Sequence, residues 1–272
     1  MTSSIVHPQY RGIVVKVGTD VLLTKNHTLN KKRIRHIIEQ IMRVKRELRM
    51  RHFILVTSGK VTAGLAAYGR RRPPQKLTLP EKQKYATAGN ELYEIIRHSL
   101  LEHKCRANIT EVTRKNFRDI VERDNMLQAM RSINEDEKDG LIVMNENDFV
   151  ATEELDYSFG DNDRLAEAAV MLTRADVLAI LTSTHGIQRD LKSPISTIEI
   201  YTEDCDQFIL KDAQSKNGVG GADVKVDVCK RLAKEGVTSH IMNGTTDGIL
   251  SHVLLDGRRG NGINWTTFPP DA

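Results

Sequence analysis

The chain alternates between two hydrophobic periods along almost its whole length, and this alternation restricts the fold more than any other feature. Short β-branched runs such as residues 13–17 predict buried strands, whereas residues 29–49 carry isoleucines at helical spacing. Strands and helices that alternate in this way build a mostly parallel sheet with helices on both faces. We therefore predict an α/β fold, a three-layer αβα sandwich around a mostly parallel central sheet. The predicted strands cover residues 13–17, 53–56, 109–112, 141–144, 177–181, 237–242 and 263–268.

The segments between these strands are amphipathic or rich in small residues, as helices of such a sandwich are. Residues 69–80 predict a basic, proline-containing loop, and residues 186–206 show no clear period. The chain contains no internal repeat and no linker-like stretch, so we expect a single domain over residues 1–272, with its core at roughly 11–268. The predicted helices cover residues 29–49, 60–68, 81–103, 117–133, 164–173 and 222–234.

Composition argues against membrane, secreted and disulfide-rich classes of protein. No apolar run approaches the roughly 20 residues that span a bilayer, and the N-terminus lacks the pattern of a secretory signal. Cys105, Cys205 and Cys229 lie far apart without C-x-x-C spacing, which argues against a disulfide scaffold or structural zinc. With 40 basic and 36 acidic residues the net charge is only +4. We therefore expect a cytoplasmic protein without membrane or nucleic-acid partners.

Small and charged residues follow the predicted strands, where ligands bind in open α/β sheets. Lys16 and Gly18 end the first strand, and there a glycine permits close approach to a phosphate while a lysine adds a point charge. Ser58 follows the second strand at the start of a helix, where free N–H groups attract anions. Each motif alone also has an ordinary explanation, a turn glycine beside a surface lysine in one case and a helix N-cap in the other.

Two clusters of amide and carboxylate side chains add to this edge of the predicted sheet. Residues 145–148 are Asn-Glu-Asn-Asp directly after a buried strand, and residues 160–163 are Gly-Asp-Asn-Asp before an alanine-rich helix. A turn explains part of the first cluster, and an N-cap at Asn162 or Asp163 explains part of the second. The twelve-residue calcium-loop pattern does not follow, which excludes an EF-hand.

A glycine-rich stretch, residues 218–221, precedes a helix that carries Lys225 in or near its first turn. The helix dipole disfavours a cation there, so a bound anion would explain this lysine. The spacing fits neither the Walker A loop nor G-x-G-x-x-G, and a flexible turn explains the glycines alone equally well. Together, the two glycine-plus-lysine elements suit the phosphates of a nucleoside triphosphate, and the polar clusters suit an amino group or an ordered Mg²⁺ shell.

In these motifs the sequence resembles the glutamate 5-kinase branch of the amino acid kinase family. The resemblance extends over roughly residues 11–268. Its most branch-specific part is the pair of Asn-Glu-Asn-Asp and Gly-Asp-Asn-Asp clusters, whereas the Lys-x-Gly-Thr and Gly-Gly…Lys elements are shared across amino acid kinases. The matching blocks are VVKVGTDVL (14–22), ILVTSGKVTAG (54–64), VMNENDFVAT (143–152), GDNDRLAEAAVMLTRADVLAILT (160–182) and GVGGADVK (218–225).

The resemblance implies ATP-dependent phosphorylation of the γ-carboxylate of glutamate, the first step of proline synthesis, with Mg²⁺ as the cofactor. It assigns contact with the transferring phosphoryl group to Lys16 and Lys225, and the orientation of these lysines to Asp163. The residues that it assigns to the amino acid are Ser58, Asp148 and Asn162. The residues that it assigns to the nucleotide are Lys16, Gly18, Thr182, Ser183, Gly220, Gly221 and Lys225. It assigns no protein side chain to the metal.

The chemistry that the resemblance implies needs no general base. A carboxylate is already an anion at neutral pH, so positioning and neutralisation of the phosphoryl oxygens suffice. The acyl phosphate product is labile in water, so we expect a lid or a downstream reductase that accepts it. The family also implies a homo-oligomer. We expect no C-terminal RNA-binding-like domain, which many bacterial members carry.

Departures from the family pattern leave alternatives open. Lys60 replaces the alanine of T-S-G-A beside the amino-acid site, and it either points to solvent or recognises a carboxylate or phosphate. Ser183 replaces the aspartate of the nucleotide Thr-Asp pair. The arginines at 70–72 are also unusual, although a solvated surface loop explains them. The alternatives are a kinase of the same fold for another small carboxylate or amino-acid-like compound, and a ligand-sensing module without turnover.

Overall fold

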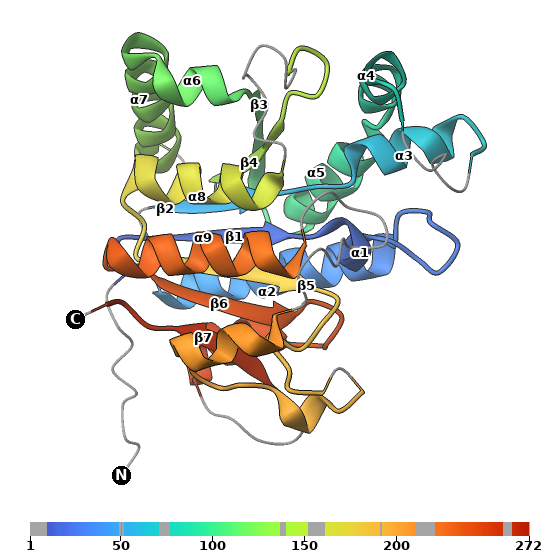
Figure 1. Cartoon of the computed structure of the whole chain (residues 1–272). Helices are drawn as coiled ribbons and strands as arrows, with labels where there is room; N and C mark the ends of the chain where they lie inside the picture. The colour runs from blue at the N-terminus through green and yellow to red at the C-terminus, as the bar shows by residue number, and fades with distance from the viewer. Residues whose placement is uncertain are drawn as a thin grey trace.

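A seven-stranded sheet forms the centre of the molecule (Figure 1). The strands are β1 (Gly12–Val17), β2 (His52–Val56), β3 (Arg106–Val112), β4 (Gly140–Glu146), β5 (Val177–Thr182), β6 (Thr238–Asn243) and β7 (Trp265–Phe268). Their order in the sheet is β3-β4-β2-β1-β5-β6-β7, and neighbouring strands are parallel except for β6 and the edge strand β7. This computed structural model describes residues 10–48, 50, 52–70, 77–136, 140–151, 161–190, 192–209, 221–257 and 263–271.

Helices cover both faces of the sheet, which confirms the predicted three-layer αβα sandwich. None of the helices in the described ranges combines the length and the apolar character that crossing a bilayer requires. The helices are α1 (Thr19–Leu22), α2 (Lys31–Leu48), α3 (Lys60–Ala67), α4 (Leu79–Ala88), α5 (Glu91–Glu102), α6 (Arg114–Arg118), α7 (Ile120–Asp136), α8 (Asn162–Thr173), α9 (Ala222–Lys234) and α10 (Ile249–Ser251), with short 3₁₀ turns η1 (Pro194–Ser196) and η2 (Glu203–Phe208) and a π-helical turn η3 (His252–Asp256).

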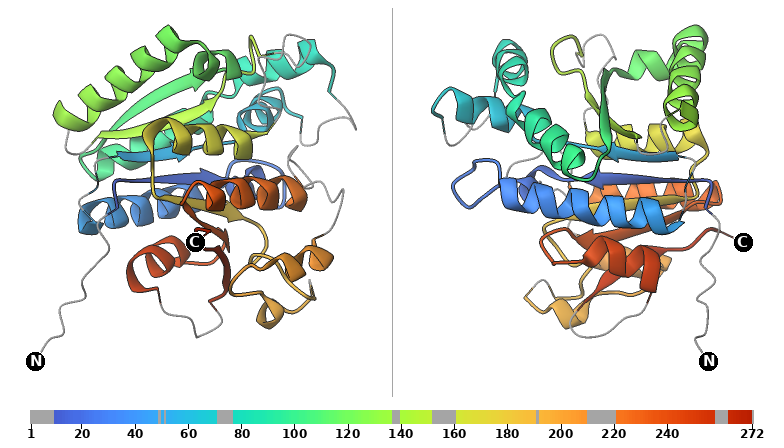
Figure 2. Two further views of the ribbon diagram at one scale, coloured as in Figure 1. Left: turned by 60° about the vertical axis from the view of Figure 1, so that its left-hand side comes forward. Right: turned by 180° about the vertical axis from the view of Figure 1, so that it is seen from behind.

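Alternate side chains of the strands pack into two separate apolar layers. Along β1, Ile13 and Val15 join the layer formed with α2 and α5, whereas Val14 joins the layer formed with α8 and α9. Figure 1 shows α8 and α9 in front of the sheet, and the view from behind in Figure 2 brings α2 forward. Every residue of β1 is buried, because both faces of the sheet are covered. Because β1 has three strands on either side of it, its carboxyl end lies in the middle of one edge of the sheet.

Two segments that the sequence predicts as single helices are each divided. The segment at 81–103 forms α4 and α5, with the break at Gly89, where a Cβ would lie 2.0 Å from the carbonyl oxygen of Lys60. The segment at 117–133 is divided at Asp119, whose extended backbone separates α6 from α7. These predictions are wrong because apolar spacing continues through such breaks, whereas tertiary packing interrupts the helix.

Gly64 on α3 faces the backbone of α4 even more closely. A Cβ at this position would lie 1.8 Å from the carbonyl oxygen of Tyr85, so α3 and α4 must separate to accept it. We expect Gly64→Ala to lower the free energy of unfolding by about 2 kcal/mol, because overpacking outweighs the higher helix propensity of alanine. Denaturant unfolding measures the change, with Ala67→Ser at the exposed end of α3 as the control. An unchanged midpoint for Gly64→Ala would contradict this close crossing.

Candidate active site

The carboxyl ends of the parallel strands bring the motif residues to one edge of the sheet. Lys16 lies next to the last residue of β1, Ser58 follows β2, Asp148 follows β4, and Thr182 ends β5. The strands β4, β2, β1 and β5 are consecutive neighbours. Residues that are far apart in the sequence therefore meet along this edge, as the motif positions predict.

Asp163 is the centre of a charged cluster at this edge. Its carboxylate is fully buried, with one oxygen 2.6 Å from Lys16 Nζ and the other 3.0 Å from Lys225 Nζ. Lys16 reaches it from β1, and Lys225 reaches it from the first turn of α9. Lys225 Nζ also donates a hydrogen bond to the carbonyl oxygen of Gly221 at 3.1 Å. The three residues predicted to be catalytic thus lie in direct contact.

The start of α8 explains how Asp163 comes to be buried. Asp161 is the N-cap, and its side chain accepts a hydrogen bond from the backbone N–H of Asp163 at 3.1 Å. Leu165 and Ala166 are also fully buried as α8 packs on the sheet. The alternative explanation of this cluster, an N-cap at Asn162 or Asp163, is wrong, because Asp161 is the N-cap and α8 already begins at Asn162.

The two neighbouring aspartates have opposite pKa shifts. Burial acts to raise the pKa of Asp163, but the ammonium groups of Lys16 and Lys225 outweigh it and hold that pKa below its usual value. Burial, followed by the charge of Asp163, raises the pKa of Asp161 to about 6. At neutral pH, ionisation of Asp161 therefore lowers the stability of the folded protein, whereas ionisation of Asp163 raises it.

The raised pKa of Asp161 predicts a pH-dependent cost to stability. Because its folded-state pKa of about 6 exceeds the ordinary value of 3.8 for an aspartate, ionisation lowers the stability of the folded protein as pH rises between these values. We expect Asp161→Asn, which keeps an oxygen for the N-cap, to raise the free energy of unfolding by about 2 kcal/mol near pH 8 and to change it little near pH 4. Thermal unfolding across this range measures the difference. An equal gain at both pH values would contradict the shift.

Some buried polar atoms at this edge have no hydrogen-bond partner among the described residues. They include Thr57 Oγ1, Asp161 Oδ2 and Asn162 Oδ1. Leaving such an atom unpaired costs about 1–3 kcal/mol, so native proteins keep unpaired groups mainly where a ligand, water or ion satisfies them. Ser58 differs, since its hydroxyl donates to the carbonyl oxygen of Val17 at 2.7 Å. The edge therefore offers unsatisfied hydrogen-bonding groups to a polar ligand.

A second charged cluster lies where α3 and α4 approach β3 and β4. The Asp148 carboxylate lies 2.9 Å from Lys82 Nζ of α4. Lys60, the first residue of α3, is buried and forms an ion pair with Glu111 of β3. The Glu111 carboxylate also accepts a hydrogen bond from the Tyr93 hydroxyl at 2.7 Å, and Lys60 Nζ lies 5.3 Å from the centre of the Tyr93 ring. Of the two alternatives for Lys60, the structure excludes the solvent-exposed one.

Sequence reasoning missed Glu111, Tyr93 and Lys82. Glu111 gives the one available signal, a carboxylate near the end of a predicted strand. Its partner Lys60 is 51 positions away, and only the register of β3 beside β4 and β2 brings the two together. Arg70 is exposed, as a surface loop predicts, whereas residues 71–76 lie outside the described residues.

The residues assigned to the nucleotide lie at the ends of β1 and β5 and at the start of α9. The backbone N–H of Gly18 donates to a carbonyl oxygen of β5 at 2.9 Å. Gly221 is the buried N-cap of α9. Thr182 is half-buried and Ser183 is exposed, while Gly220 lies outside the described residues. Contact of these residues with a nucleotide stays a prediction.

Relatives of this chain are found by comparison of its sequence with those of known proteins. The model described as "Amino acid kinase family" matches residues 11–243. The glutamate 5-kinase of Caldanaerobacter subterraneus subsp. tengcongensis is 34% identical over 268 residues, which cover 95% of this chain and 68% of that protein. Glutamate 5-kinase 2 of Bacillus licheniformis is 32% identical over 267 residues, which cover 96% and 68%.

Solved structures of low sequence identity share the fold. The UMP kinase from Bacillus anthracis superposes with a TM-score of 0.59 at 14% identity, covering 97% of this chain and 98% of that one. An isopentenyl phosphate kinase also gives a TM-score of 0.59 at 14% identity, covering 94% and 98%. These structures show the fold, and the sequence matches confirm the resemblance that the motifs indicate. The chain belongs to the amino acid kinase family, and within it to the glutamate 5-kinase branch.

Proposed function

We propose that this kinase transfers the terminal phosphoryl group of Mg-ATP to the γ-carboxylate of L-glutamate, giving γ-glutamyl phosphate and ADP, the first step of proline synthesis. The observation that carries this proposal is the placement of Lys16 and Lys225 on opposite oxygens of the buried Asp163 carboxylate. The relatives of this chain that are named glutamate 5-kinase support the choice of acceptor.

Lys16 and Lys225 stabilise the transferring phosphoryl group in this proposal. Asp163 holds both ammonium groups in place before the substrates bind, so little reorganisation remains at the moment of transfer. An acceptor carboxylate oxygen attacks phosphorus while the bond from phosphorus to the bridging oxygen of ADP breaks, and the acceptor has no proton to lose. Gly18, Thr182, Ser183, Gly220 and Gly221 line the nucleotide.

Asp148, Asn162 and Ser58 hold the amino acid. Asp148 offers its carboxylate to the substrate ammonium group, which takes the place of Lys82. The unpartnered Asn162 Oδ1 accepts a further N–H. The Ser58 hydroxyl donates to Val17, and its oxygen keeps the capacity to accept a hydrogen bond from the substrate.

Mg²⁺ fits this site as an ion carried by the nucleotide. The described residues contain no group of three or more histidine, cysteine, aspartate or glutamate side chains placed to hold a metal. Mg²⁺ commonly binds through substrate phosphates, waters and one or two carboxylates. Asp161, with its unpartnered Oδ2, is the carboxylate that fits this role. When bound, the ion neutralises the β- and γ-phosphate oxygens.

The first test is ADP release from Mg-ATP with and without L-glutamate, with hydroxylamine present to trap an acyl phosphate. We expect glutamate-dependent ADP and an equal amount of hydroxamate. Absence of hydroxamate with glutamate would overturn the proposed acceptor. Thermal stabilisation by ATP and glutamate without any ADP release would instead indicate a ligand-sensing module.

The buried Lys60–Glu111 pair favours a second candidate, a kinase of the same fold for another small carboxylate. Lys60 adds a charge where the family pattern places an alanine, and Glu111 pairs with it. A panel of carboxylic acids distinguishes the candidates by kcat/KM. A much higher value for an acid other than glutamate would favour the second candidate.

The proposed product also implies partners. An acyl phosphate hydrolyses readily in water, so we propose a downstream reductase that accepts it promptly. We further propose a homo-oligomer, which light scattering of the purified protein tests directly.

A further inference from the structure

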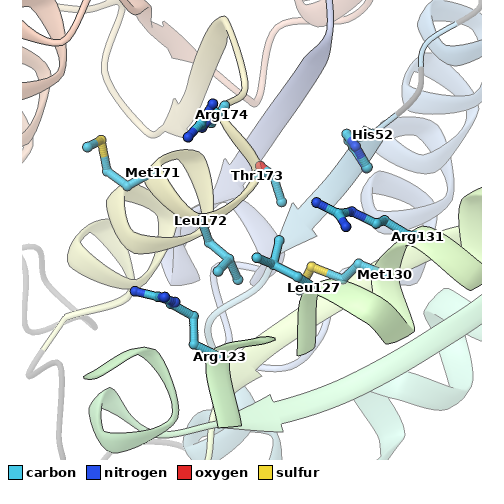
Figure 3. Close-up of a pocket in the computed structure, with 9 residues that line it drawn as sticks. All are labelled: His52, Arg123, Leu127, Met130, Arg131, Met171, Leu172, Thr173 and Arg174. Carbon is cyan, nitrogen blue, oxygen red and sulfur yellow. The ribbon is translucent and has the colours of Figure 1, made fainter. Parts of the chain in front are cut away.

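A cavity with a volume of about 490 Å³ lies between α7 and α8, away from the residues described above (Figure 3). His52 begins β2, and Thr173 and Arg174 stand at the end of α8 just before β5. The cavity therefore lies at the amino edge of the sheet, whereas the candidate active site lies at its carboxyl edge. Its volume falls within the range of pockets that hold small organic ligands, about 300–1,000 Å³.

The inner part of this cavity is apolar. Figure 3 shows Leu127 and Met130 of α7 close to Leu172 of α8. Met130 is only 4% exposed and joins the apolar layer formed by α8 and α9. Met171, which also lines the cavity, is 47% exposed, so apolar surface continues from the interior to the opening. Such a surface suits the apolar body of a ligand.

Three arginines line the same cavity. Arg123 and Arg131 come from α7, and Arg174 comes from the end of α8. Among the described residues, Arg131 and Arg174 form no ion pair, and Arg123 has only its sequence neighbour Asp124 at 3.4 Å. The cavity thus gathers three positive charges with one carboxylate in contact with them. Arginine is suited to phosphate and carboxylate oxygens because its guanidinium group donates two parallel hydrogen bonds.

Helix dipoles explain only one of these three positions. Arg174 is the C-cap of α8 in the left-handed conformation, with φ 52°, and a cation is favourable at a helix C-terminus. Arg123 stands in the first turn of α7, where the dipole disfavours a cation, and Arg131 stands within the same helix. Figure 3 shows the three arginine side chains spaced around the cavity, so a bound anion would offset positive charge that Asp124 alone contacts among the described carboxylates.

We propose that this cavity binds a small organic phosphate, with its phosphate on the arginines and its apolar body against the leucine and methionine side chains. The site is distinct from the active site, since the two lie at opposite edges of the sheet. The inference therefore does not depend on the acceptor of the kinase reaction.

The test is isothermal titration of the full chain with phenyl phosphate, which combines an apolar ring with a phosphate group. Inorganic phosphate supplies the anion alone, and phenol supplies the ring alone. We expect phenyl phosphate to bind at least about tenfold more tightly than either, because only it fills both parts of the cavity. We expect Arg131→Gln/Arg174→Gln to weaken the binding of phenyl phosphate at least about tenfold. We expect Arg131→Lys to weaken it less, because lysine keeps the charge but lacks the two parallel N–H donors of the guanidinium group.

Matched variants separate this cavity from other cationic surfaces. Arg46→Gln on the exposed face of α2 removes one arginine elsewhere and leaves the affinity unchanged. Lys225→Ala removes a phosphate-binding group of the active site and also leaves the affinity for phenyl phosphate unchanged. Equal binding by Arg131→Gln/Arg174→Gln and the unsubstituted protein would overturn the proposal, as would loss of binding in Lys225→Ala alone. If the double variant does not fold, Arg131→Lys serves as the test. An unchanged affinity of that variant for phenyl phosphate would then overturn the proposal.

Discussion

Lys225→Ala should lower kcat by about 10³-fold while the protein stays folded. Its ammonium group is one of two that flank Asp163, at 3.0 Å, and alanine removes a largely buried charge that we propose acts on the phosphoryl group. Loss of one such electrostatic contact typically lowers kcat about 10²–10³-fold. Because Lys16 remains to neutralise Asp163 at 2.6 Å, the carboxylate keeps a partner and the fold is preserved.

Initial rates of ADP release at saturating substrate measure this loss, with circular dichroism as the check on folding. Lys234→Ala on the exposed last turn of the same helix is the matched control, and its kcat should equal that of the unsubstituted protein. A decrease of less than about tenfold in Lys225→Ala would remove this lysine from the catalytic model.

Glu111→Gln should lower the free energy of unfolding by about 3 kcal/mol, which is large for one isosteric change. The substitution keeps an oxygen for the Tyr93 hydroxyl but removes the charge that neutralises Lys60. The Lys60 side chain is 8% exposed, so its ammonium group would stay buried without a counter-charge. Breaking a buried ion pair from one side typically costs about 3–5 kcal/mol for this reason.

Removal of both charges should restore most of that loss. Methionine matches the length of lysine, so Lys60→Met/Glu111→Gln leaves a neutral pair of similar volume. Urea unfolding of the two single variants and the double variant gives the coupling free energy. Additive effects would show that Lys60 and Glu111 do not act as a pair, whatever their closeness. The KM values for glutamate and other acids, measured on Lys60→Met, report whether the pair also shapes the acceptor site.

Periodicity and motif position predict the sheet and much of the charged cluster from sequence. The buried runs of β1, β2, β4 and β5 coincide with predicted strands, because strands covered on both faces are continuously apolar. Lys16, Asp163 and Lys225 come together as expected, since each lies at the carboxyl edge of a strand or the start of a helix.

Features that depend on contacts between distant segments are not predictable in this way. At Gly89, where the helix breaks, a Cβ would meet the backbone of Lys60, and Asp161 caps α8 while two lysines from distant segments contact Asp163. The local sequence pattern likewise does not predict the partner of Lys60, because only the order of the strands brings Glu111 close to it.

The strand order divides the sheet into two contiguous stretches of chain. The strands β1 to β4, within residues 12–146, occupy one half, and β5 to β7, within residues 177–268, occupy the other. Asp163 lies between the two stretches in sequence and is bound by one lysine from each side. Of the residues that we propose for the acceptor, Ser58 and Asp148 follow strands of the first stretch, whereas Thr182, Ser183 and Gly221, proposed for the nucleotide, lie in the second or border its helix α9. We therefore expect substitutions that change the acceptor acid to fall mainly in or directly after the first stretch, where Ser58, Lys60 and Asp148 lie.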